Sequence, residues 1–142
     1  MVMSARFDES LVTGYGMIDE QHMELINRIN ELIRSCEDGK GRVKAIKMLD
    51  YLADYTDFHF AEEEKLQEEI KYPGIEEHKQ KHEEFRAAVK ELREMLEEME
   101  GPTDAFVDAV NRNVTEWLYG HIKGFDCSVA TYMHMNSIPH LL

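Results

Sequence analysis

The chain has 142 residues, which predicts a single domain, and its hydrophobic content of 43% is enough to form a core. Its formal net charge of −13 argues against nucleic acid or an anionic membrane surface as a partner, because both attract Lys and Arg. Apolar runs of at most three residues exclude a membrane-spanning helix and a signal peptide, and two cysteines exclude a disulfide scaffold, so we expect a cytoplasmic protein.

The predicted elements begin with a short arm. Residues 1–17 are too few and too broken by Gly14 and Gly16 to form a long helix, and we expect them to lie over the rest of the fold. Four longer segments follow, each with apolar residues at steps of three and four, which is typical of amphipathic helices. Their apolar stripes cover 18–36, 46–70, 75–99 and 106–125. Glycine and proline mark the turns between them, at Gly39 and Gly41, at Pro73-Gly74 and at Gly101-Pro102.

The sequence predicts an all-α fold, an antiparallel up-down four-helix bundle with an N-terminal arm. No segment alternates like a strand, and helices joined by such short turns pack against their neighbours in this way. Thr103 followed by Asp104 is typical of a helix start, which places the beginning of the fourth helix there. We expect the bundle to span residues 18–132 and a tail to cover 133–142.

Polar residues interrupt the apolar stripes at positions that should face the core. They are five histidines and one glutamate: His22, His59, Glu63, His78, His82 and His121. A single histidine on such a face is more often a hydrogen-bonded core residue than a metal ligand. His59 and Glu63, and also His78 and His82, are four residues apart, which puts both members of each pair on one helix face. Burying so many polar groups without partners is costly, so together they indicate a site.

The topology brings these residues to one end of the bundle. The start of the first helix, the end of the second, the start of the third and the end of the fourth share an end, and Asp126 belongs to the same layer. Such convergence is what a buried metal site requires. Asp126 follows His121 by five residues and would point away from it in a regular helix. We therefore predict a π-type turn between His121 and Asp126, which Gly124 would ease.

The number and type of the candidate ligands limit which metal ions the site could bind. Seven ligands exceed one ion and suit two, and imidazole with carboxylate suits iron and its divalent neighbours better than magnesium or calcium. Zinc prefers four ligands in a tetrahedron. No histidine of the layer has a glutamate three residues before it, which disfavours the ferritin-like pattern, and His78 is not followed by the glutamate of a metalloprotease. The spacing alone does not choose iron over manganese.

These residues match the pattern of a known family. The order His, His-x3-Glu, His-x3-His, His-x4-Asp resembles that of bacteriohemerythrins, the prokaryotic members of the hemerythrin family. The stretch Leu11-x2-Gly14-x3-Ile18-Asp19-x-Gln21-His22 looks like the family's N-terminal signature, and Trp117-Leu118 stands where the family has Trp-Leu before the last histidine. The resemblance covers roughly residues 7 to 130.

The resemblance implies a non-haem centre of two iron ions joined by an oxo or hydroxo bridge. Histidines would hold each iron and two carboxylates would bridge the pair: His78, His82 and His121 on one iron, His22 and His59 on the other, Glu63 and Asp126 between them. One coordination position stays open, on the iron with two histidines, where dioxygen would bind. Apolar residues near the ligands are expected to wall this position, or else to pack as ordinary core: Phe60, Trp117, Leu118 and Ile122.

From this resemblance we expect reversible binding of dioxygen, for carriage, storage or local supply. We favour a monomer and an oxygen-binding protein rather than an enzyme. Two alternatives stay open. The same centre could serve an oxidoreductase acting on peroxide, nitric oxide or O2, or an O2 or redox sensor module working with a separate partner.

The remaining candidates lie outside the ligand pattern. We interpret Cys127 as a small buried residue at a helix end, with an oxidant-sensitive thiol as the alternative. Cys36 and Cys127 should lie at opposite ends of the bundle, so we predict no disulfide between them. His134 and His140 are expected at the surface of the tail, with adventitious metal binding as the alternative.

Overall fold

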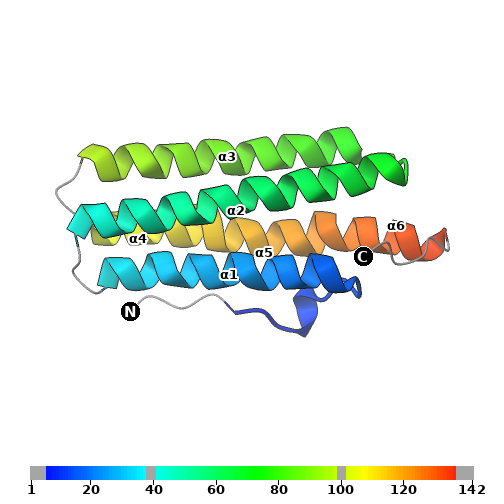
Figure 1. The fold of residues 1–142 in the computed structure, drawn as a ribbon, viewed down its shortest axis with the longest axis horizontal. Coiled ribbons are helices and arrows are strands. Elements are labelled where there is room, and N and C mark those ends of the chain that lie inside the picture. The colour runs from blue at the N-terminus through cyan, green and yellow to red at the C-terminus, as the bar shows by residue number, and fades with distance from the viewer. Residues whose placement is uncertain (1–5, 38–40, 99–101, 137–142) are drawn as a thin grey trace.

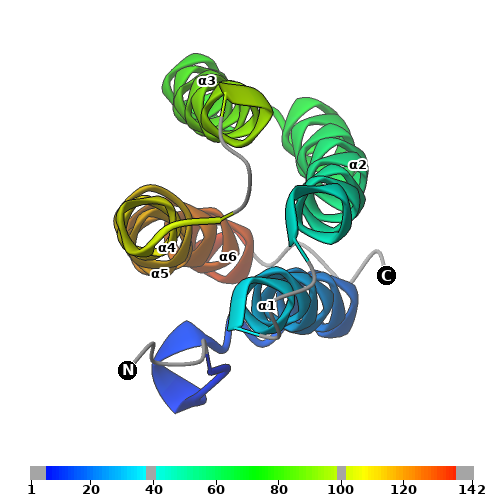
Figure 2. The same cartoon turned by 90° about the vertical axis from the view of Figure 1, so that its left-hand side faces the viewer.

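A computed structural model describes residues 6–37, 41–98 and 102–136, and it confirms the all-α up-down bundle (Figures 1 and 2). Three of its helical rods are regular: α1 (Gly16–Glu37), α2 (Gly41–Glu69) and α3 (Ile75–Glu98). The fourth rod is a succession of helical elements: α4 (Asp104–Val110), the π-helix η2 (Asn111–Glu116), α5 (Trp117–His121), the π-helix η3 (Ile122–Asp126) and α6 (Cys127–Met135). Consecutive rods run in opposite directions and enclose one core.

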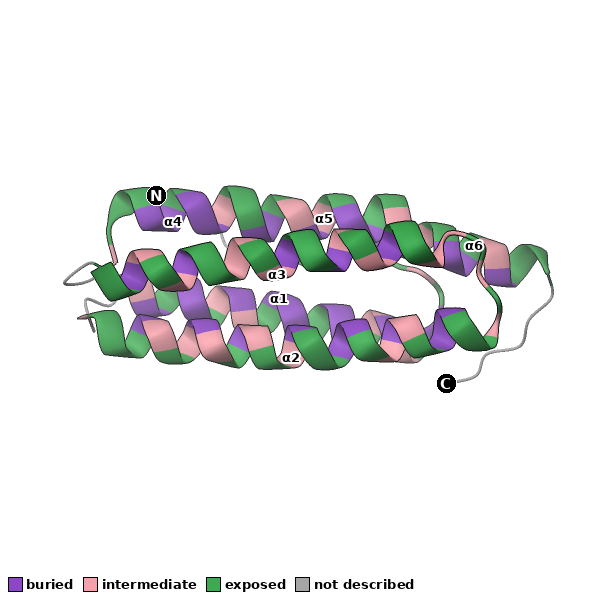
Figure 3. Cartoon of the chain, turned by 90° about the horizontal axis from the view of Figure 1, so that it is seen from above, coloured by how far each residue is buried: buried purple, intermediate pink, exposed green. Residues whose placement is uncertain are grey.

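The helices form where the apolar periodicity predicts them. Buried residues make an inward-facing stripe along each rod, and exposed residues face outward (Figure 3). The fourth rod begins at the predicted position, because the Thr103 hydroxyl oxygen accepts a hydrogen bond from the Phe106 backbone N–H at 3.1 Å. Among the described residues, no helix is both long enough and apolar enough to span a membrane.

Two apolar clusters make up the core. The larger one fills most of the bundle and includes Leu32, Leu49, Leu96 and Phe106, all fully buried. The smaller one lies at the end of the bundle where α2 turns into α3. Its buried members are Tyr15, Ile18, Leu66, Val129, Ala130 and Met133. The polar layer of histidines and carboxylates lies between these two clusters along the rods.

The smaller cluster explains why the helical part extends beyond both predicted boundaries. Helix α1 begins at Gly16 rather than at residue 18, and α6 continues to Met135 rather than ending at 132. Met133 has no exposed surface and packs in the same cluster as Tyr15. Burial of this apolar surface extends α6 past the predicted end. His134 is exposed on α6, as predicted, and His140 lies outside the described residues.

The segment before α1 lies over the bundle (Figure 1). Its short 3-10 helix η1 (Glu9–Leu11) buries Leu11 in the larger cluster. The Arg6 backbone N–H donates a hydrogen bond to the Tyr119 hydroxyl at 2.5 Å. The Asp19 carboxylate, in the first turn of α1, accepts hydrogen bonds from Thr13 and Gly14. These bonds fix the start of α1 and so help to position His22, the ligand that this helix carries.

Candidate metal centre

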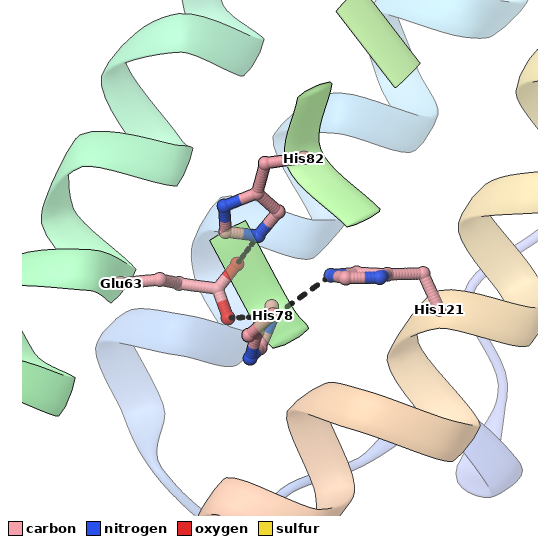
Figure 4. Close-up of side chains that lie close together, drawn as sticks. All are labelled: Glu63, His78, His82 and His121. Atoms are coloured by element: carbon pink, nitrogen blue, oxygen red, sulfur yellow. Dashed lines mark hydrogen bonds and ion pairs between the residues drawn. The ribbon is translucent and has the colours of Figure 1, made fainter. Parts of the chain in front are cut away.

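The structure brings together all seven residues predicted as ligands. They form two groups of buried donors, each with ligand atoms within 4.8 Å of one another: Glu63, His78, His82 and His121 in one, and His22, His59, Glu63 and Asp126 in the other. We call them the three-histidine group and the two-histidine group. Figure 4 shows the first of these, with the Glu63 carboxylate facing His78 and His82, and His121 approaching His78 from the fourth rod. The Nε2 atoms of His78 and His121 are 2.9 Å apart.

Two carboxylates lie between the groups. Glu63 Oε1 is 2.7 Å from His59 Nε2 and 3.8 Å from His82 Nε2. Asp126 Oδ2 is 2.8 Å from His22 Nε2, whereas its Oδ1 is 3.0 Å from His78 Nε2 and 3.3 Å from His121 Nε2. Asp126 therefore turns one oxygen toward each group. Glu63 reaches both groups through Oε1, and its Oε2 is 3.9 Å from His78 Nε2. Both carboxylates thus contact both groups, as bridging ligands must.

Several donor atoms of the layer are buried without a hydrogen-bond partner. They are His22 Nε2, His59 Nε2, His82 Nε2, Glu63 Oε1 and both carboxylate oxygens of Asp126. Their close approaches to one another lack hydrogen-bond geometry, and an unsatisfied buried group costs about 1–3 kcal/mol. Ligand atoms about 2.1 Å from a shared ion lie about 3–4 Å apart, which fits the spacing within each group. The residues therefore fit a pair of metal ions.

Burial and neighbouring charges shift the pKa values of the side chains in the layer. Burial acts to lower the pKa of His22 and of His78, but the adjacent Asp126 carboxylate outweighs it and raises both above the ordinary value. Burial lowers the pKa of His82 to about 2, and the charges of His78 and His121 add to this effect. Burial acts to raise the pKa of Asp126, yet the surrounding imidazoles hold it well below its usual range. His82 is therefore neutral at physiological pH, the form that binds a metal.

Three residues that the sequence analysis did not identify contact the Nδ1 atoms of ligand histidines. In each of these rings Nδ1 is the outer nitrogen, which faces away from the other ligands, whereas Nε2 faces them. The Gln21 Oε1 atom is 2.6 Å from His59 Nδ1, and Glu64 Oε2 is 2.8 Å from His82 Nδ1. Both oxygens can accept a hydrogen bond from an Nδ1–H group, a tautomer that leaves Nε2 free for a metal. Gln67 Nε2 lies 2.8 Å from His78 Nδ1, and Gln67 Oε1 has no partner. A half-turn of this amide would place its oxygen there instead, with the same effect on Nε2.

Gln67 left a signal in the spacing of the sequence, whereas Gln21 stands there only as a member of the stretch that resembles the family's N-terminal signature. Gln67 follows Glu63 by four residues, so it occupies the same inward face of α2, and it is 1% exposed. Gln21 and Glu64 directly adjoin the ligands His22 and Glu63, but each contacts a histidine of another helix, which spacing along the chain does not show.

The predicted π-turn is confirmed. The π-helix η3 covers Ile122–Asp126, and the Cys127 backbone N–H donates to the carbonyl oxygen of Ile122, five residues earlier. The wider turn brings Asp126 round to the face that carries His121, and their side chains meet at 3.3 Å. The second π-helix, η2, was not predicted, and its buried residues are Val114 and Thr115.

Aromatic side chains pack against the three-histidine group. Phe60 stacks on His82 with ring centres 3.7 Å apart and planes 5° apart. His121 lies between Trp117 and Phe125, which stack on it at 4.5 Å and 5.3 Å. The other two predicted wall residues, Leu118 and Ile122, are buried in the larger apolar cluster. Phe60 and Trp117 therefore fix the orientation of ligand rings, whatever further role they have.

The cysteines lie toward opposite ends of the bundle as predicted, but Cys127 is half-buried rather than buried. Cys36 is near the end of α1 and Cys127 is the first residue of α6, at opposite ends of the bundle. Burial raises the pKa of the Cys127 thiol, and the charges of Asp126 and Asp19 raise it further.

Comparisons with known proteins agree with the geometry. Residues 13–126 match the family described as the Hemerythrin HHE cation binding domain. The chain belongs to the hemerythrin family. A bacteriohemerythrin of Stenotrophomonas maltophilia is 33% identical over 132 residues, which are 92% of this chain and 83% of that protein. The myohemerythrin of Riftia pachyptila is 31% identical over 120 residues, 84% of this chain and 86% of its own length.

Hemerythrins also share the fold seen here. The crystal structure of a hemerythrin variant is similar to this chain with a TM-score of 0.78 at 24% identity, and the match covers 92% of this chain and 97% of that one. The hemerythrin domain binds a di-iron centre, and the buried cluster of this chain can hold metal ions. Family membership and the cluster together support a di-iron protein that binds oxygen.

Proposed function

We propose that this hemerythrin-family chain binds dioxygen reversibly at two iron ions, held by the residues of the two groups. His78, His82 and His121 would hold one iron, His22 and His59 the other, and Glu63 and Asp126 would bridge them. The observation that carries this assignment is the placement of the two carboxylates, each of which lies 2.7 to 3.8 Å from imidazoles of both groups. When bound, the iron pair supplies reducing electrons and a coordination position for a diatomic ligand.

The protein's own residues do the rest. The Gln21 and Glu64 oxygens hold the His59 and His82 rings so that Nε2 faces the carboxylates. Leu118 and Ile122 are buried beside the layer, and we propose that they limit access of water and protons, which favours binding of dioxygen over loss of electrons to it. All seven ligands come from one chain, so the site needs no second copy to be complete, and we propose a monomer as the working unit. We propose that it works in the cytoplasm.

Two measurements test this proposal. Metal analysis of protein loaded with ferrous iron should give two irons per chain. The reduced protein should then take up dioxygen to form a coloured adduct, and vacuum should release the gas and return both irons to the ferrous state. Fewer than two tightly held irons would overturn the ligand assignment. Repeated turnover of peroxide, nitric oxide or O2, or rapid irreversible oxidation, would indicate an oxidoreductase instead.

A further inference from the structure

The five ligand rings differ in what holds their outer nitrogen. His59 Nδ1 contacts the Gln21 amide oxygen and His78 Nδ1 contacts the Gln67 amide. His82 Nδ1 alone of the described set contacts a carboxylate, that of Glu64, at 2.8 Å. The Nδ1 atoms of His22 and His121 are buried with no hydrogen-bond partner. The two groups are therefore unequal in charge, because a carboxylate reaches a ring of the three-histidine group and only a neutral amide reaches the two-histidine group.

Glu64 is placed to act on His82 without binding metal itself. Its side chain retains 23% of its exposed surface, whereas the His82 side chain has none. Glu64 belongs to neither group of candidate ligands. A hydrogen bond to a charged acceptor is about twice as strong as one between neutral groups, and it makes the imidazole a better electron donor through Nε2.

We propose that Glu64 is a positioning residue that favours the oxidised form of the metal held by the three-histidine group. The inference rests on the proposed function and deepens it. An oxidised metal carries more positive charge than a reduced one, so a carboxylate on the far side of its ligand stabilises the oxidised form more. Gln21 offers no such charge to the other group. Glu64 therefore makes the two sides of the pair unequal in reduction potential and lowers that of the three-histidine side.

The test compares two variants with the same change in net charge. Glu64→Gln keeps the size of the side chain and removes its charge beside His82. Glu68→Gln removes a charge one turn further along α2, where the exposed carboxylate pairs with Lys79 at 3.3 Å and contacts no ligand ring. Reduction potentials are measured by spectroelectrochemical titration of the iron-loaded proteins, together with iron content and helical circular dichroism.

We expect Glu64→Gln to raise the ratio of reduced to oxidised centre at fixed potential about tenfold, equal to about 59 mV for one electron. Glu68→Gln should stay close to the parent protein, because solvent screens its charge. A Glu64→Gln protein that holds two irons and titrates like Glu68→Gln would overturn the inference and leave the proposed function standing. A parent protein without two irons would overturn the proposed function, and the inference with it.

A swapped variant separates charge from shape. Combining Glu64→Gln with Gln67→Glu moves the carboxylate from His82 to His78, a ring of the same group. We expect the potential to return toward that of the parent, since the charge again adjoins the three-histidine side. A folded swap that keeps the potential of Glu64→Gln would contradict a charge effect. If the buried glutamate prevents folding, the comparison of Glu64→Gln with Glu68→Gln decides the matter.

Discussion

The larger apolar cluster and the polar layer are built from the same four rods but obey different rules. In the cluster, residues such as Leu49 and Leu96 contribute by being apolar and of the right size. Other apolar residues of similar volume would stabilise the fold nearly as well at these positions. In the layer, seven residues must each be of one kind, because their donor atoms converge on one place. The comparison teaches that one part of this bundle is specified by burial and the other by coordination.

The two regions also contribute to the stability of the fold with opposite signs. Apolar burial in the cluster stabilises the fold at about 25 cal/mol per Å². The layer instead buries imidazoles and carboxylates whose donor atoms lack hydrogen-bond partners, so without a counter-charge it opposes folding. We therefore expect apolar burial in the cluster to stabilise the fold without metal. The layer should stabilise the fold only when its ions are bound.

Removing the metal should have the largest effect, and it should act through the layer alone. An ion present at 1,000 times its dissociation constant stabilises the fold by about 4 kcal/mol, and a chelator removes this contribution. We expect the melting temperature measured by calorimetry to fall by several degrees and to recover when ferrous iron is restored. Equal melting temperatures with and without metal would show that the layer is not coupled to folding.

A large-to-small change in the cluster should act without touching the layer. Leu49→Ala removes a fully buried side chain and should lower the free energy of unfolding by about 2–5 kcal/mol. Chemical denaturation should show a similar loss in metal-loaded and metal-free protein, while iron content stays at that of the parent. A loss of iron in this variant would mean that the two regions are not independent.

The difference between the cluster and the layer also explains which features of the fold could be predicted from the sequence. The bundle follows from the periodicity of residues such as Leu49 and Leu52, and the π-helix η3 follows from the five-residue gap between His121 and Asp126 once both must face one site. The second π-helix, η2, escaped prediction because no pair of ligands brackets it. Spacing along the chain reveals a distorted helix only where chemistry demands a particular direction.

Residues that contact the ligand rings from another helix cannot be predicted from spacing along the chain. Phe60 was expected near the site, but the ring on which it stacks, His82, depends on how α2 and α3 pack. Glu64 is partly exposed and stands outside the inward stripe, so its role depends on a rotamer and on the position of a neighbouring helix. Contacts between rods require the packed structure, whereas contacts along one rod follow from periodicity.

The pH dependence of metal loading should sharpen the comparison further. The raised pKa values of His22 and His78 mean that their protons stabilise the metal-free fold below about pH 6.5, and that this contribution is lost as pH rises through the raised values. Iron must displace these protons, so its affinity should fall by up to about tenfold per pH unit for each proton as pH is lowered. Competition with a chromophoric chelator at several pH values measures this slope. A flat profile would contradict it, and Leu49→Ala should leave the slope unchanged.

The smallest effect concerns the boundary between the two regions, where Leu118 belongs to the cluster but lies three residues from the ligand His121. Leu118→Ala should open the layer to water and speed oxidation of the reduced, oxygen-loaded protein about tenfold, about 1.4 kcal/mol in activation free energy. Leu92→Ala, equally buried in the same cluster on α3, is the matched control. It should destabilise the fold about as much and leave the oxidation rate near that of the parent. Equal rates in the two variants would mean that Leu118 acts only by packing, so that the apolar cluster takes no part in the chemistry of the layer.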